Sequence, residues 1–271
     1  MAIDPFKERV ISLALRTAEA HGYALAGGNA LAAHGLLSRP TQDIDLFTAA
    51  PGRTAHVVDA VRAALTDEGY AVDVVRTTSD GDFAELHVSR DGHSTQLDLG
   101  RDWRAHDTVR LDVGPVLHLD DAVGAKTTAL LGRALPRDFI DIAAALERYS
   151  RRELLELAFR RDPGLRPADA ALAAQWLDRL EDGLFTPYQL TGEDVARIRA
   201  RFASWPRDPD GDREARAAHA AAHRPPTTAA DQAAAAFPTP IADVLATPTP
   251  TSPVRPTEPT AELPPNTRHR R

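Results

Sequence analysis

The chain has 271 residues, of which 43% are hydrophobic and 26% charged, proportions typical of a globular protein with a substantial core. It has no cysteine, which excludes disulfide bonds, thiolate zinc sites and cysteine nucleophiles. The formal net charge of −7 gives no overall attraction to nucleic acid, and neither a membrane span nor a secretory signal is visible. We therefore expect a cytoplasmic protein that does not contact a membrane.

The first 115 residues alternate between short helical and strand-like segments. Asp4-Pro5 has the form of a helix N-cap followed by proline, which predicts a helix from there to about Ala20. Further helices are predicted at 29–36 and 54–65, and strands at 23–26, 43–48, 71–77, 83–89 and 95–99. This order is typical of a small α/β domain, which we place at residues 1–115.

The pattern then becomes helical, and later loses its apolar residues. Helical spacing predicts a second domain at residues 116–205, with helices at 122–135, 138–149, 151–159, 168–180 and 193–202. Residues 206–271 hold 13 of the 21 prolines and a single aromatic residue, Phe237. Such a stretch buries too little apolar surface to offset its ordering entropy, so we expect a disordered tail at 206–271.

Two short motifs in the first domain point to phosphate and metal chemistry. Gly27 and Gly28 open a predicted helix, where backbone N–H groups and the helix dipole favour anions. Asp43 and Asp45 share one face of a predicted strand, because side chains alternate along it, and their carboxylates suit Mg²⁺. Each motif alone is more often structural, since Gly-Gly commonly marks a turn and Asp-x-Asp is commonly a solvated strand.

A third carboxylate is expected at Asp98, in a strand whose Leu97 and Leu99 face the core. An acid inside an apolar strand is costly unless it is paired with a cation, and such an acid can ligate metal or accept a proton. Three further acids compete for this role on the sequence alone: Asp73, Asp82 and Asp112.

The helical half contributes one lysine and two acids. Lys126 lies among apolar helical positions, where it can contact phosphate oxygens or simply extend to solvent. Asp138 and Asp141 are three residues apart on a predicted helix and are therefore neighbours on its surface. Their alternative role is helix capping or an ion pair with Arg133 or Arg137.

The same half holds several arginines that can meet RNA phosphates or form ion pairs on a solvated face. They are Arg148, Arg151, Arg152, Arg160 and Arg161.

Taken in order, four segments resemble the AbiEii/AbiGii toxin family, within the nucleotidyltransferase superfamily related to DNA polymerase β. The segments are Gly27–Leu31, Arg39–Phe47, Lys126–Leu130 and Arg137–Asp141. The resemblance implies an α+β fold: a polymerase-β-like nucleotidyltransferase domain with a small mixed sheet flanked by helices, a helical domain and the disordered tail.

The resemblance also implies an activity. The protein would move a nucleoside monophosphate from a nucleoside triphosphate to an acceptor, most often the 3′ end of tRNA, with two Mg²⁺ ions. It would act as the toxin of a bacterial toxin–antitoxin system, restrained by a separately encoded antitoxin. The alternatives are a nucleotidyltransferase that modifies a small molecule such as an aminoglycoside, one that modifies a protein hydroxyl, and a catalytically silent nucleotide-binding protein.

Site roles follow from the same resemblance. The carboxylates Asp43, Asp45 and Asp98 would bind the metal ions and perform catalysis. The nucleotide would be bound by Gly27, Gly28, Lys126, Asp138 and Asp141.

Overall fold

The computed structural model describes residues 3–52 and 54–224. Within this part of the chain, strands form one mixed sheet in the order β3-β4-β5-β2-β1-β7-β6. The strands are β1 (Ala24–Leu25), β2 (Asp43–Thr48), β3 (Ala71–Thr77), β4 (Phe83–Arg90), β5 (His93–Arg101), β6 (Val109–Leu111) and β7 (Gly114–Val116). The mixed α+β architecture that the sequence predicts is confirmed.

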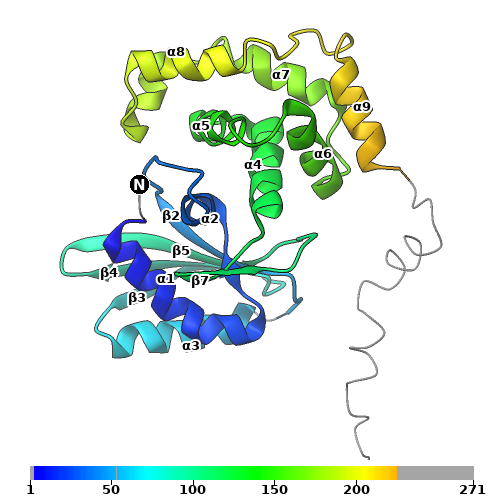
Figure 1. Cartoon of the computed structure of the whole chain (residues 1–271). Helices are drawn as coiled ribbons and strands as arrows, with labels where there is room; N and C mark the ends of the chain where they lie inside the picture. Colours follow the sequence, from blue (N-terminus) through cyan, green and yellow to red (C-terminus); the bar gives the residue numbers. More distant parts are fainter. Residues whose placement is uncertain (1–2, 53, 225–271) are drawn as a thin grey trace, which may run out of the picture. The chain divides into compact units, whose positions relative to one another are not determined.

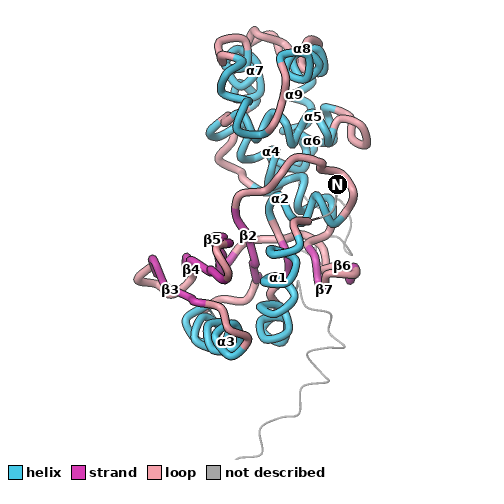
Figure 2. Tube along the Cα trace, turned by 90° about the vertical axis from the view of Figure 1, so that its left-hand side faces the viewer, coloured by secondary structure: helices cyan, strands magenta, loops and turns pink. Residues whose placement is uncertain are grey.

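Three helices cover the two faces of this sheet. The helices α1 (Pro5–Ala18) and α3 (Thr54–Asp67) pack side by side on one face, and α2 (Gly27–Ala33) lies on the other (Figures 1 and 2). The predicted N-cap of the first helix is confirmed, because the Asp4 carboxylate accepts hydrogen bonds from the backbone N–H groups of Phe6 and Lys7.

The helical part follows the sheet and is organised around α4, which packs against α2, α5, α6 and α7 (Figure 1). Its helices are α4 (Leu119–Arg133), α5 (Pro136–Ala145), α6 (Arg151–Arg161), α7 (Pro167–Leu177), the 3₁₀ segment η2 (Asp182–Tyr188), α8 (Gly192–Arg201) and α9 (Arg213–Ala222). The contact between α2 and α4 brings the glycine motif on one side close to Lys126 on the other.

The two strands that carry the predicted acids are neighbours in the sheet. Strands β2 and β5 pair in parallel, with Asp45 directly opposite Asp98. Burial alternates along both strands, and the leucine and isoleucine side chains between the acids are fully buried, as predicted. The period of two therefore places the acids together on the other face of the sheet.

The structure corrects the predicted tail at its beginning. Residues 213–222 form α9, which packs on α6 and buries Ala215 and Ala218. Its N-cap, Asp212, is fully buried and binds Arg151. Short alanine side chains let two helices approach closely, so little apolar surface is needed for this contact. Residues 225–271 of the predicted tail lie outside the described residues.

Smaller differences concern short elements. The strands β6 and β7 have three residues each, and β7 contains Pro115, so neither shows an alternating pattern long enough to be recognised. The chain up to residue 224 forms one compact unit. The division into domains at 1–115 and 116–205 remains a prediction about independent folding. Among the described residues, no helix is long and apolar enough to cross a membrane.

Candidate active site

A cavity of about 230 Å³ lies where α2, β2 and β5 meet α4 and α5. The predicted residues Gly27, Gly28, Asp43, Asp45, Asp98 and Lys126 all line it. Residues from positions 27 to 126 of the chain are thus brought to one place, although only the order of the motifs indicated this in the sequence.

Gly27 is required at this position by both its backbone and its surroundings. Its φ angle is +60°, which is unfavourable for other residues, and a Cβ atom there would lie 1.7 Å from Asp45 Oδ2. A Cβ on Gly28 would be 2.9 Å from the Thr41 methyl group. The glycine pair therefore lets the start of α2 approach the carboxylate of Asp45 with no side chain between them.

The acids of the cavity are held in an environment that disfavours their negative charge. Burial, together with the adjacent Asp43 carboxylate, raises the pKa of Asp45 to about 7. Burial also raises the pKa of Asp98, against the opposing effect of Gln96, whose side-chain amide donates to both Asp98 oxygens at 2.9 and 3.1 Å. A bound divalent cation would remove this penalty, so the donor set fits a hard metal ion.

The spacing of the three acids is wide for a single ion. In a compact metal-type cluster, the ligand atoms of three residues all lie within 4.8 Å of one another. Within the described part of the chain this holds for His106, His118 and Asp120. The carboxylates of Asp43, Asp45 and Asp98 are not such a group, and they come from two paired strands.

A hydrogen-bond chain connects α2 to the segment before β2. The buried Asn29 donates from Nδ2 to the backbone carbonyl of Asp43 at 2.7 Å and accepts from the Thr41 hydroxyl at 2.8 Å. Lys7 donates to the Thr41 carbonyl from α1. These contacts fix the start of β2, and therefore Asp43, relative to the glycine motif.

On the cationic side of the cavity, two residues share one buried acid. Asp141 is fully buried and binds Arg39 through two hydrogen bonds of 2.7 and 2.8 Å. Lys126 Nζ lies 3.1 Å from Asp141 Oδ2, and its side chain is 13% exposed. Because Arg39 and Lys126 line the cavity while Asp141 lies behind them, Asp141 orients two cations toward the cavity.

Two further arginines reach the same cavity from α4 and α5. Arg133 is held by Asp138 through two hydrogen bonds of 3.0 and 2.9 Å, and Asp138 also accepts from the Leu135 backbone N–H. Arg137 lies 3.9 Å from Asp43, and its Nε atom is buried without a hydrogen-bond partner. An unpartnered buried donor that lines a cavity is suited to an anionic ligand.

The structure changes the predicted roles of Asp138 and Asp141. Both are fully buried and neither lines the cavity, so the predicted direct contact with the nucleotide does not fit their positions. The capping and ion-pair role that the sequence left open describes Asp138 correctly. Each acid instead positions a cation that does face the cavity.

The competing acids and the arginine cluster lie elsewhere. Asp73, Asp82 and Asp112 do not line the cavity, which favours Asp98 as the third acid. Three arginines of the cluster form ion pairs within the fold: Arg151 with Asp212, Arg152 with Glu156, and Arg161 with Asp102. Most of this cluster is therefore not available for RNA.

Sequence reasoning missed the functional position of several residues. Arg39, Thr41 and Asn29 stand in the motif segments, but no role was assigned to them, because only the fold shows that Arg39 meets Asp141 across 102 positions of sequence. A usable signal did exist for lysine. The chain has two lysines, and both contact residues of this site. Lys7 donates to the Thr41 carbonyl, and Lys126 binds Asp141.

A comparison with known protein families identifies the family of this chain. A family model described as "Nucleotidyl transferase AbiEii toxin, Type IV TA system" matches residues 12–223. The chain belongs to this family. The predicted resemblance is therefore confirmed, and the protein is a nucleotidyltransferase toxin of a type IV toxin–antitoxin system. Family membership implies a nucleoside triphosphate substrate and a cognate antitoxin.

Two solved structures match the chain at low sequence identity, and the first of them agrees with this fold. MenT4 (Rv2826c), a nucleotidyltransferase toxin from Mycobacterium tuberculosis H37Rv, matches with a TM-score of 0.52 and 19% identity, over 80% of this chain and 92% of that one. JHP933 from Helicobacter pylori matches with a TM-score of 0.48 and 16% identity, over 82% of this chain and 96% of that one. A search of curated proteins finds no match.

Proposed function

We propose that the protein transfers a nucleoside monophosphate from a nucleoside triphosphate to the 3′ end of tRNA, in the cavity described above. The observation that carries this proposal is the composition of the cavity. Three carboxylates, of which Asp43 has the guanidinium of Arg137 at 3.9 Å, face the same space as four cationic side chains, Arg39, Lys126, Arg133 and Arg137. A polyanionic nucleotide bound together with divalent cations is complementary to both sets.

The acids are the proposed ligands of two magnesium ions. Asp43 and Asp45 would bind both ions, and Asp98 would bind one of them. When bound, the ions would supply charge stabilisation at the reacting phosphate and at the leaving pyrophosphate. The raised pKa values of Asp45 and Asp98 support this assignment. Burial disfavours the ionised form of both carboxylates, and a nearby positive charge would offset that effect.

The remaining residues would bind and orient the substrates. Gly27 and Gly28 would let the triphosphate approach the backbone of α2, and Lys126 and Arg137 would contact its oxygens. The acceptor hydroxyl attacks the α-phosphorus, the bond to the β-phosphate bridging oxygen breaks, and pyrophosphate leaves. Asp98, held by Gln96, is suited to take the proton of that hydroxyl, because a carboxylate with a raised pKa is a better base.

A second cavity supports a nucleic-acid acceptor. It has a volume of about 600 Å³ and shares Arg39 and Thr41 with the first. Phe6 and His93 line it, with their rings stacked at a centroid distance of 5.6 Å, and Lys7 lies beside them. Aromatic rings next to cations are a common platform for unpaired bases, such as those at a tRNA 3′ end.

The experiment combines purified protein, Mg²⁺, each α-labelled nucleoside triphosphate in turn, and total tRNA. We expect label in RNA with the wild type and none with the Asp43→Asn, Asp45→Asn double variant. Label on protein, or on an added aminoglycoside, would refute the tRNA acceptor while keeping the transferase. Absence of label with every acceptor and nucleotide would support a silent nucleotide-binding protein.

The second cavity has a separate test. Phe6→Ala should raise the KM for tRNA by about tenfold, as expected for the loss of one base-stacking contact, and leave the KM for the nucleotide unchanged. Phe83→Ala serves as a control, because Phe83 does not line this cavity. An unchanged KM for tRNA in Phe6→Ala would place the acceptor elsewhere.

A further inference from the structure

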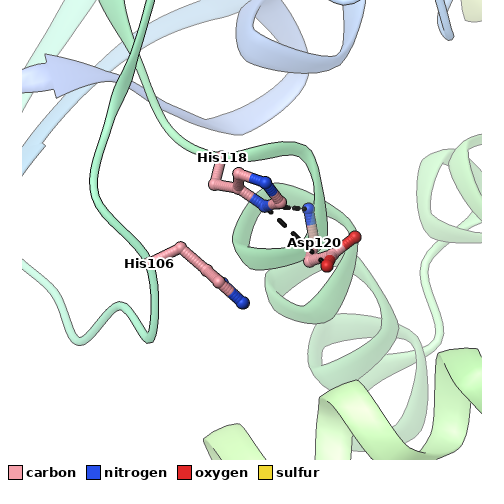
Figure 3. Close-up of side chains that lie close together, drawn as sticks. All are labelled: His106, His118 and Asp120. Carbon is pink, nitrogen blue, oxygen red and sulfur yellow. Dashed lines mark hydrogen bonds and ion pairs between the residues drawn. The ribbon is translucent and has the colours of Figure 1, made fainter.

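A second cluster of metal-type ligands lies apart from the residues proposed for catalysis. His106 comes from the loop before β6, and His118 and Asp120 stand at the start of α4 (Figure 3). One ligand atom from each residue lies within 4.8 Å of the others. A tetrahedral zinc ion with bonds of about 2.0–2.2 Å would bring such atoms to about 3.4 Å, which small side-chain rotations can achieve.

The protonation of His106 is set by a buried carboxylate. Its Nδ1 lies 3.3 Å from Asp121 Oδ2, and the same carboxylate accepts the backbone N–H groups of Ala105 and His106 at 2.9 Å each. Asp121 is 4% exposed, so this arrangement is rigid. With a proton on Nδ1 toward this carboxylate, His106 would bind a metal ion through Nε2, as in the carboxylate–histidine–metal arrangement common in zinc proteins.

The other two residues are also prepared to donate electron pairs. His118 Nδ1 accepts the Asp120 backbone N–H at 3.2 Å, and a zinc ion bound at this nitrogen would replace that hydrogen bond. Asp120 receives the Tyr149 hydroxyl on Oδ1 at 2.6 Å, while its Oδ2 lies 3.8 Å from His118 Nδ1.

Charge and space are consistent with a small divalent cation. The carboxylates of Asp120 and Asp121 can offset the charge of a divalent cation, and Arg160 and Arg161 line the neighbouring hollow. A hollow of about 10 Å³ lies against His106 and Asp120, which is on the order of one water molecule. Two imidazoles, one carboxylate and one water form a ligand set that zinc accepts readily.

We propose that His106, His118 and Asp120 bind one zinc ion, which fastens the loop before β6 to the start of α4. The residues of this site are separate from the carboxylates proposed to bind magnesium. Its role is structural, because α4 carries Lys126, and a fixed start of α4 fixes the position of that lysine.

The test is zinc binding by the full chain without nucleotide or magnesium. The protein is stripped with a chelator, titrated with Zn²⁺ alone, desalted and analysed for metal. We expect one zinc ion per chain in the wild type, a zinc affinity at least tenfold lower in His106→Gln and Asp120→Asn, and a thermal midpoint that zinc raises by a few degrees only in the wild type.

Three variants act as controls, and a fourth, His118→Asn, tests the second histidine ligand. His56→Gln removes an exposed histidine of α3 and should bind zinc normally. The Asp43→Asn, Asp45→Asn variant should also keep its zinc, which separates this site from the catalytic acids. His118→Asn preserves an N-cap for α4 and should lose zinc while staying folded by circular dichroism, whereas Asn29→Asp should leave zinc binding unchanged.

Three results would overturn the proposal. One is a wild type that retains no zinc, and another is a His106→Gln variant that retains as much as the wild type. The third is loss of zinc in the Asp43→Asn, Asp45→Asn variant, which would assign the ion to the catalytic carboxylates. Cobalt substitution gives an independent readout, since a tetrahedral site with two histidines should show visible absorption that His106→Gln lacks.

Discussion

The acidic and the basic residues of the active-site cavity are stabilised in opposite ways. Of the cations, Arg39 and Lys126 are held by the buried Asp141, and Arg133 by the buried Asp138. The acids are less well compensated: Gln96 donates to Asp98 and Arg137 lies 3.9 Å from Asp43, but burial still raises the pKa of Asp45 to about 7. The basic group is therefore complete in the folded chain, whereas the acidic group requires a ligand that brings positive charge.

This contrast suggests that the cations bind the nucleotide and the acids bind metal ions. Cations fixed by buried acids can hold a triphosphate without rearrangement, because their orientation is already determined. Carboxylates that repel one another are suited to binding metal ions, because a bound cation relieves their repulsion. Without metal, the same repulsion lowers the stability of the protein. The predictions below separate these two properties.

The largest effect on stability is expected from Asp141→Ala. This change leaves Arg39 and Lys126 without their buried counter-charge, so the free energy of unfolding should fall by about 3–5 kcal/mol. Urea denaturation followed by circular dichroism measures it. Glu193→Ala removes the exposed partner of Arg197 and should cost about 0.5 kcal/mol or less. Equal losses in the two variants would show that the buried pairs contribute no more than surface pairs.

A loss of activity of about 10²–10³-fold is expected from Gly27→Ala. The new methyl group would overlap the Asp45 carboxylate and displace it, and misplacement of a catalytic group by about 1 Å costs rates of this size. Gly92→Ala is the matched control, because Gly92 has a φ angle of +78° but no atom within 4 Å of its Cβ position. If both variants lose activity equally, backbone strain and not the clash with Asp45 is responsible.

Asp45→Asn should stabilise the metal-free protein. Because the folded-state pKa of Asp45 lies above its ordinary 3.8, ionisation destabilises the fold fully above about pH 7 and not at all below about pH 4. The gain should therefore reach a few kcal/mol at most at pH 8 in chelator, and disappear as the pH falls from 7 toward 4.

Thermal unfolding across this pH range tests the Asp45→Asn prediction. Asp59→Asn, an exposed acid of α3, should show no such trend. Saturating magnesium should reduce the difference by stabilising the wild type. A wild type more stable than Asp45→Asn at pH 8 in chelator would contradict the expectation that ionised Asp45 destabilises the metal-free fold.

The smallest effect is expected from Arg137→Gln. Its Nε has no hydrogen-bond partner in the described structure, and its only internal ion pair is the 3.9 Å contact with Asp43, so the change removes mainly a contact with the ligand. The KM for the nucleotide should rise by about tenfold, equivalent to roughly 1.4 kcal/mol, with kcat little changed. Steady-state kinetics beside Arg62→Gln, an exposed arginine of α3, provides the comparison. A tenfold fall in kcat at unchanged KM would place Arg137 in the chemical step.

The sequence predicted the acidic group better than the basic one, for a physical reason. Asp43 and Asp45 lie in one strand whose alternation puts them on the same face, so local pattern was sufficient for this pair, whereas Asp98 had three competing acids until the strand pairing was known. The pairing of Arg39 with Asp141 joins positions 102 residues apart, and no local pattern encodes it. The helix α9 was missed because its alanines resemble the composition of a disordered segment, and only packing on α6 distinguishes it.

The most direct test measures nucleotide binding and transfer side by side in Asp45→Asn and Arg137→Gln. The binding assay uses a labelled nucleoside triphosphate, and the transfer assay follows label into the acceptor at saturating nucleotide. The account predicts that Asp45→Asn loses transfer by at least about 10³-fold, whereas Arg137→Gln binds nucleotide about tenfold more weakly and transfers at nearly the wild-type rate. Normal transfer by Asp45→Asn would contradict the proposed role of the acidic group.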